Sequence, residues 1–278
     1  MYEILRKRDL TGITKLFEVK APHVARNAQP GHFVIVRIHE QGERIPLTIA
    51  DYDAQKGSVT IVVQEVGYTS AMLNRLGEGD QIVDFAGPLG VPAPMPTQGS
   101  VVLLGGGFGV APILPIAKEL RRREVKVTSI IGARSKDLII LEDEMRQASD
   151  EIHLCTDDGS AGFKGFVTQK LEELVAGGAS FDECIAIGPM PMMRATAHTT
   201  KPMGLKTWVS MDPIMVDGTG MCGACRVTVS GKVKFACVDG PFFDAHEVDF
   251  DEALRRNRIY KQQEAQIYEV CRRGGESR

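Results

Sequence analysis

The chain has 278 residues, enough for two ordinary domains that each bury a core. Hydrophobic residues make up 43% of it and charged residues 25%, which is typical of a soluble globular protein, and a net charge of −3 gives no reason to expect nucleic acid as a partner. No apolar run approaches the length of a membrane span, and the start, MYEILRKRDL, lacks the apolar core of a secretory signal. We therefore expect a cytoplasmic protein.

The first part of the chain, residues 1–95, is rich in short β signals. Apolar or alternating stretches at His32–Ile38, Ser58–Val66 and Asp80–Gly87 are separated by turns that contain glycine. One stretch, Thr69–Leu76, has the character of a helix. Several short strands at this spacing predict a small antiparallel barrel.

A segment rich in proline and glycine, residues 87–99, follows the predicted barrel and marks a domain boundary. Beyond it, over residues 96–210, strand and helix patterns alternate, which predicts a parallel sheet covered by helices. The strands are expected at residues 101–104, 125–132, 151–157, 183–188 and 206–211. The helices are expected at residues 112–123, 165–178 and 191–201.

Two turns in this second part have the character of phosphate sites. GGGFGVAP (Gly105–Pro112) lies between a strand and a helix, where Gly107 and Gly109 allow a close backbone approach. Val110, Ala111 and Pro112 mark the helix start, where the N–H that proline lacks is not needed. A tight turn without a ligand would have the same sequence. A second strand-to-helix turn, with Gly188, Pro189 and Met190, should face the same crevice, because ligands bind at the carboxyl ends of parallel strands.

The last part, residues 211–278, contains three clustered cysteines and ends in a charged stretch that looks helical and exposed. The pattern is D-x4-C-x2-C-x11-C, formed by Asp217, Cys222, Cys225 and Cys237. It matches the plant-type spacing for a two-iron cluster, with aspartate in place of the first cysteine. A structural zinc ion, or an Asp217 that only shapes the turn while water is the fourth ligand, would fit the same residues. Cys155 and Cys184 lie on predicted buried strands, as core residues do.

Four motifs together resemble the ferredoxin–NADP reductase superfamily, in which a flavin-binding barrel precedes a nicotinamide-binding α/β domain. The motifs are RIPLTIA (Arg44–Ala50), GYTSAML (Gly67–Leu73), GGGFGVAP (Gly105–Pro112) and GPMPMM (Gly188–Met193). The resemblance implies that FAD is bound by Arg44, Pro46, Leu47, Thr48, Gly67, Thr69 and Ser70. In it, Arg44 neutralises the flavin pyrophosphate, and NAD(H) binds across the two glycine turns.

With its cysteine segment, the whole chain resembles a narrower group, the electron-transfer subunits of dihydroorotate dehydrogenase and their relatives. The set of one aspartate and three cysteines is most similar to the small subunit of NADH-dependent ferredoxin:NADP oxidoreductase, with the sulfide dehydrogenase β subunit as a further relative. TDDGSAGFKGFVT (Thr156–Thr168) is also shared by this group.

This resemblance implies a subunit with FAD, a two-iron cluster and NAD(H) that exchanges electrons with a larger flavin and iron–sulfur subunit, and through that partner with ferredoxin, by electron bifurcation. A dihydroorotate or sulfide dehydrogenase subunit, a stand-alone flavin reductase and a zinc-stabilised binding module remain as alternatives. NADH is expected over NADPH, with Asp157 near the ribose, although Arg134 offers a charge for a 2′-phosphate. Hydride transfer itself needs no acid or base, so no catalytic side chain is expected.

Overall fold

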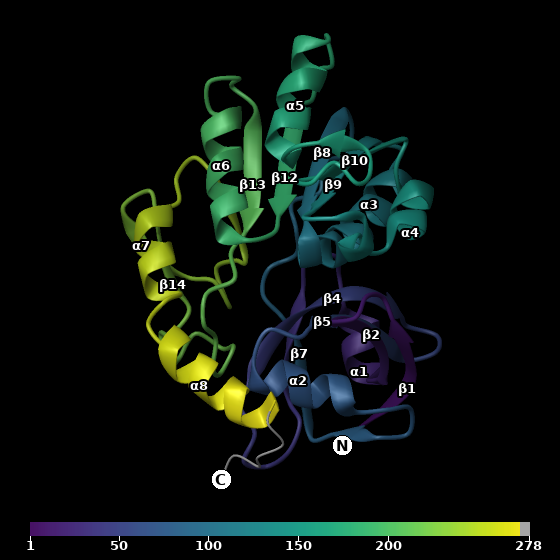
Figure 1. The fold of residues 1–278 in the computed structure, drawn as a ribbon, viewed down its shortest axis with the longest axis vertical. Helices are drawn as coiled ribbons and strands as arrows, with labels where there is room; N and C mark the ends of the chain where they lie inside the picture. The colour runs from purple at the N-terminus through teal and green to yellow at the C-terminus, as the bar shows by residue number, and fades with distance from the viewer. Residues whose placement is uncertain (273–278) are drawn as a thin grey trace.

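The protein is built on two seven-stranded sheets that lie one above the other, as the computed structural model shows (Figure 1). It describes the backbone of residues 1–272 and the side chains of residues 1–269. The first sheet has the order β6-β1-β2-β5-β4-β3-β7, every pairing in it is antiparallel, and it curls into a nearly closed barrel. Its strands are β1 (Tyr2–Asp9), β2 (Thr14–Lys20), β3 (Phe33–Arg37), β4 (Ile45–Asp53), β5 (Ser58–Gln64), β6 (Gln81–Ile82) and β7 (Asp84–Leu89). Its helices are α1 (Pro22–Asn27) and α2 (Tyr68–Arg75).

The antiparallel barrel predicted from the sequence is confirmed, with differences in its strands. The stretch 80–87, expected as one strand, is two, because the chain bends between β6 and β7. Strand β1 was not predicted: only Ile4 along it is buried, so its sequence does not alternate. Its pairing with β2 and β6 holds it in place instead.

The second sheet has the order β11-β10-β9-β8-β12-β13-β16 and is parallel except for its last strand, β16. Its strands are β8 (Ser100–Gly106), β9 (Lys126–Ala133), β10 (Glu151–Thr156), β11 (Phe163–Lys164), β12 (Glu183–Ile187), β13 (Lys206–Ser210) and β16 (Phe242–Asp244). Its helices are η1 (Gly107–Gly109), α3 (Val110–Arg122), η2 (Lys136–Leu138), α4 (Glu142–Ala148), α5 (Val167–Ala176) and α6 (Met190–Thr200). All five predicted strands and all three predicted helices are confirmed.

Separate apolar cores cover the two faces of this parallel sheet. Helices α3 and α4 pack on one face with Ile113, Ile116 and Met145. Helices α5 and α6 pack on the other, where Leu171 and Met193 are fully buried. Because the sheet is buried on both faces, its strands are continuous apolar runs, which is why the sequence located them well.

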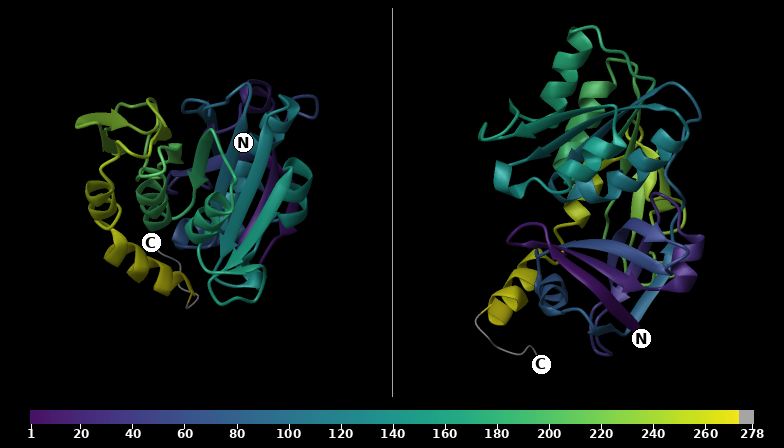
Figure 2. Two further views of the ribbon diagram at one scale, coloured as in Figure 1. Left: turned by 90° about the horizontal axis from the view of Figure 1, so that it is seen from above. Right: turned by 90° about the vertical axis from the view of Figure 1, so that its right-hand side faces the viewer.

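The C-terminal segment returns from the upper sheet to the barrel (Figure 1; Figure 2). It contains a hairpin of β14 (Arg226–Val229) and β15 (Lys232–Phe235), then helices α7 (Phe250–Arg256) and α8 (Lys261–Arg272). The predicted helical tail is therefore two helices separated by a turn. Helix α8 reaches the barrel, where the Tyr268 hydroxyl donates a hydrogen bond to Glu65 Oε1 at 2.7 Å.

Two ion pairs join the barrel to the upper domain on the side of α3 and α4. Lys118 Nζ lies 2.6 Å from Asp51 Oδ2, and Arg8 Nη2 lies 2.5 Å from Glu144 Oε1. These contacts fix the distance between the two sheets, and with it the width of the space between them.

None of the helices over the described residues is long and apolar enough to cross a membrane.

Candidate functional site

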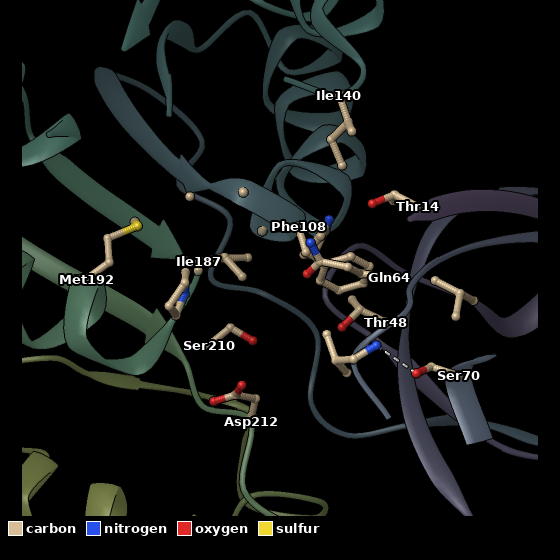
Figure 3. A pocket seen from close by; sticks show the side chains of 18 of the residues that line it. Thr14, Thr48, Gln64, Ser70, Phe108, Ile140, Ile187, Met192, Ser210 and Asp212 are labelled. Carbon is tan, nitrogen blue, oxygen red and sulfur yellow. Dashed lines mark hydrogen bonds between the residues drawn. The ribbon is translucent and has the colours of Figure 1, made fainter. Parts of the chain in front are cut away.

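A cavity of about 1090 Å³ lies between the barrel and the carboxyl ends of the parallel strands (Figure 3). It is lined by the barrel, by both glycine turns and by the segment that follows β13. Twelve of the residues predicted from the sequence line it: Pro46, Leu47, Thr48, Gly67, Thr69, Ser70, Gly107, Gly109, Pro112, Asp157, Gly188 and Pro189. The fold thus brings all four sequence motifs and Asp157 to one site.

On the barrel wall, the hydroxyls at the start of α2 are engaged in local hydrogen bonds. Ser70 Oγ accepts hydrogen bonds from the amides of Val66 at 2.9 Å and Gly67 at 3.0 Å. Thr69 Oγ1 donates to Glu43 Oε2 at 2.5 Å. These contacts order the first turn of α2 at the cavity wall, and with it the amides that a helix start offers to an anion.

Arg44 is the one barrel residue of the predicted set that does not line the cavity. Its side chain is 42% exposed, and its Nη2 lies 3.8 Å from Asp84 Oδ2. The residues on either side of it, Glu43 and Ile45, do line the cavity. Arg44 therefore lies at the cavity's outer edge, paired loosely with a carboxylate.

On the side of the two glycine turns, three of the predicted residues do not line the cavity. Val110, Ala111 and Met190 are buried in the sheet cores, with 2%, 1% and 5% of their surface exposed. Their positions at the starts of α3 and α6 leave only amide groups for a ligand. Gly107, at φ +54, has open space around it and turns the backbone toward the cavity.

The two glycine turns touch each other, and only glycine allows this. A Cβ on Gly109 would overlap the carbonyl oxygen of Ile187, and a Cβ on Gly188 would lie 3.1 Å from the Cα of Gly106. A Cβ on Gly106 would in turn overlap the sulfur of Met192. The glycines thus allow the β8–α3 turn to pack closely against the β12–α6 turn, so that both turns present their amides to one cavity.

The ends of β9 and β10 place a cation and a carboxylate on the same wall. Arg134 and Asp157 both line the cavity. The neighbouring Asp158 does not: its carboxylate accepts hydrogen bonds from the Ser160 hydroxyl at 2.6 Å and amide at 2.9 Å, which lower its pKa. Asp158 shapes the turn, and Asp157 is the acid that lines the cavity.

Sequence reasoning missed the wall that follows β13, where Ser210 and Asp212 face the cavity on the side opposite Thr48 (Figure 3). Asp212 lies on the cavity wall with its side chain exposed to that space. Desolvation by the protein around it raises its pKa to about 6. Asn257 Nδ2, at the end of α7, donates to the Asp212 carbonyl at 3.4 Å. The sequence did indicate this wall, because the strand predicted at residues 206–211 is parallel and its carboxyl end lies at the same sheet edge as the two glycine turns.

The four candidate metal ligands lie outside the cavity and form two pairs. Asp217 Oδ1 lies 3.3 Å from Cys222 Sγ, and Cys225 Sγ lies 3.2 Å from Cys237 Sγ. Cys225 and Cys237 are buried, whereas Cys222 is exposed. Within the described residues, no three His, Cys, Asp or Glu side chains converge on one point.

The local environment keeps Asp217 ionised. Desolvation would raise its pKa, but hydrogen bonds from the Thr219 amide and hydroxyl and from the Cys222 thiol and amide outweigh it and lower the pKa to about 2. Gly218, Gly220 and Gly223 all have positive φ, so the loop turns tightly around this carboxylate. Cys155 and Cys184 are buried core residues of β10 and β12, as predicted.

Comparison with known protein families gives two matches. Residues 103–198 match the oxidoreductase NAD-binding domain, and residues 212–249 match the iron–sulfur cluster binding domain of dihydroorotate dehydrogenase B. The two matched ranges contain the glycine turns and all four candidate ligands.

Individual relatives cover nearly the whole chain. A protein of Thermotoga maritima described as a homologue of the dihydroorotate dehydrogenase B (NAD(+)) electron transfer subunit is 48% identical over 276 residues, 99% of this chain and 97% of that protein. A chain in a solved structure of an NADH-dependent reduced ferredoxin-NADP oxidoreductase, studied for flavin-based electron bifurcation, is 47% identical with a TM-score of 0.92 over 97% of both chains. A Neisseria gonorrhoeae ferredoxin NADP+ reductase with bound FAD and NADP, at 20% identity and a TM-score of 0.62 over 73% of this chain and 91% of that one, shares the fold alone. The chain therefore belongs to the family of dihydroorotate dehydrogenase B electron-transfer subunits and their homologues, within the larger group of ferredoxin–NADP reductase folds.

Proposed function

We propose that this electron-transfer subunit oxidises NADH at an FAD held in the cavity and passes the electrons singly, through a two-iron cluster, to a larger partner subunit. The observation that carries the proposal is the single cavity, lined on one side by the barrel and on the other by both glycine turns and Asp157. A flavin accepts a hydride and releases electrons one at a time, which connects a nicotinamide to an iron–sulfur cluster.

The residues present fit these two groups. We assign the FAD site to the barrel residues Pro46, Leu47 and Thr48 and to the start of α2, with Arg44 at the pyrophosphate. We assign NAD(H) to the amides of the two touching turns, with Asp157 at the ribose, which favours NADH because a carboxylate repels a 2′-phosphate. We further propose that residues 1–95 form the FAD domain, 96–210 the NAD domain and 211–278 the cluster segment and tail.

The paired arrangement of the four ligands supports a two-iron cluster over a zinc ion. A zinc ion would draw all four ligands to one centre. In a two-iron cluster each iron takes two protein ligands, and here Asp217 lies beside Cys222 while Cys225 lies beside Cys237. A carboxylate is a competent ligand for iron, and Asp217 is held in its ionised form.

The cluster has an open side from which electrons leave the chain. Met221 has 88% of its surface exposed, and the adjacent Cys222 is exposed as well. We propose that this side faces a larger subunit with a second flavin and four-iron clusters, which exchanges electrons with ferredoxin by bifurcation. The 47% identity to a chain of the NADH-dependent reduced ferredoxin-NADP oxidoreductase supports this assembly. A second candidate function is that of the electron-transfer subunit of a dihydroorotate dehydrogenase, because the Thermotoga relative is described as a homologue of such a subunit.

Substitution of Asp217 tests the cluster assignment. Asp217→Ala should lose iron or hold a labile cluster, whereas Asp217→Cys should keep it, because thiolate is also a ligand for iron. Cys184→Ala, which changes a buried cysteine of the parallel sheet, is the matched control and should retain its iron. Full iron and an unchanged paramagnetic spectrum in Asp217→Ala would refute the assignment of Asp217 as a ligand.

A further inference from the structure

Every NADH oxidised in the cavity leaves behind one proton that the cluster cannot carry. A hydride consists of two electrons and one proton, and an iron–sulfur cluster removes only the electrons. The balance is NADH giving NAD+, two electrons and one proton. This proton must leave the space between the two sheets, and in the reverse direction one must be supplied there.

The segment that follows β13 offers a side chain for this task. Asp212 lines the cavity beside Ser210, on the wall opposite Thr48 (Figure 3). No other described residue donates a hydrogen bond to its carboxylate, in contrast to Glu43, which accepts one from Thr69 at 2.5 Å. Asp212 therefore faces the cavity with its carboxylate engaged by its own backbone amide alone.

The position of Asp212 also separates it from the other charged groups of the cavity. Those groups are Glu43 beside α2, Arg134 and Asp157 at the ends of β9 and β10, and Glu264 on α8. Asp212 instead follows β13, whose backbone pairs directly with β12, the strand that ends in the second glycine turn. It thus lies at the same sheet edge as the turn assigned to the nicotinamide, on the side opposite Thr48 of the wall assigned to the flavin (Figure 3).

We propose that Asp212 accepts the proton left by hydride oxidation in the cavity and returns it in the reverse reaction, an inference that rests on the proposed function. Desolvation by the surrounding protein raises the pKa of this carboxyl to about 6, and a proton carrier is most effective when its pKa lies close to the pH of the reaction. Asn257 holds the Asp212 carbonyl at 3.4 Å, so the end of α7 fixes the backbone that positions the carboxylate.

The test compares Asp212→Asn, Asp212→Glu and the exposed control Asp143→Asn in the full chain with its cofactors. NADH oxidation is followed with ferricyanide, which takes electrons and no protons. In the wild type and the control, the rate should fall as the pH drops through about 6, because protonated Asp212 cannot accept a proton. Asp212→Asn should not show this fall in rate at acid pH, and at neutral pH it should oxidise NADH on the order of 100-fold more slowly than the wild type. Asp212→Glu should recover most of the wild-type rate.

A second measurement does not depend on turnover. The infrared band of a protonated carboxyl should titrate near pH 6 in the wild type and in Asp143→Asn, and it should be absent from Asp212→Asn. A band that persists in Asp212→Asn, or a variant that keeps the wild-type rate and pH profile, would overturn this inference alone. A wild-type chain that holds no flavin would overturn the proposed function and this inference together.

Discussion

Alanine at Gly109 should separate the two glycine turns and damage both stability and NADH binding. The backbone of Gly109, at φ −61 and ψ −10, suits any residue, so the whole effect comes from the added methyl group. That methyl would lie 2.5 Å from the carbonyl carbon of Ile187 and 2.8 Å from the amide nitrogen of Gly188. Carbon atoms in contact lie about 3.5 Å apart, so the turns must move about 1 Å away from each other.

Overpacking of this kind costs about 1–3 kcal/mol in the free energy of unfolding. A displacement of about 1 Å in a binding site can lower the rate of the reaction at that site on the order of 100-fold. Urea unfolding and NADH-dependent flavin reduction should therefore both report the change. Gly12→Ala is the control, because nothing lies within 4 Å of its added methyl group. If Gly109→Ala matched this control in stability and in the KM for NADH, the packing argument for the two turns would be wrong.

Three further predictions concern single side chains. Arg44→Ala should sharply lower flavin content, measured by absorbance after purification, because the pyrophosphate charge is left unopposed; wild-type content would remove Arg44 from the site. Asp157→Asn should raise the KM for NADH about tenfold, and in diaphorase assays it should discriminate less between NADH and NADPH than the wild type does. If the wild type itself preferred NADPH, Arg134 would be the residue that selects the nucleotide. Glu119→Gln should lower stability by about 1 kcal/mol at neutral pH. Hydrogen bonds from Arg122 and Arg123 lower the Glu119 pKa from 4.5 to about 2, so the difference between wild type and variant should shrink as pH falls from 4.5 toward 2, and a constant difference would contradict this.

The sequence predicted the parallel sheet well because buried strands carry an unambiguous signal. Strands such as Glu183–Ile187 are apolar after their first residue and end in glycine-bearing turns, so both their type and their shared edge could be inferred. Helix α4 was missed because it is only seven residues long and is preceded by Leu141, whose φ of +54 no propensity rule anticipates. Strand β4 was noticed as a motif and not as a strand, because Pro46 near its start argues against one.

At the site, motifs located the walls but not the contacts across them. Spacing alone selected Asp217, and the structure places its carboxylate beside Cys222. The hydrogen bond from Thr69 to Glu43 could not be inferred, because it joins the first turn of α2 to a loop 26 positions earlier in the chain. The end of β13 could have been assigned to the cavity wall, but Asp212 itself could not be singled out. A single aspartate before a proline has the sequence of a turn, and only the assembled cavity shows that Asp212 lines it.

Cofactor analysis of the anaerobically purified full chain, before and after addition of NADH, tests the central claim most directly. The account predicts about two irons, two acid-labile sulfides and one flavin per chain, with NADH bleaching the flavin absorbance and producing the paramagnetic signal of a reduced cluster. A colourless chain that contains zinc and no iron, or a flavin that NADH does not reduce, would contradict it.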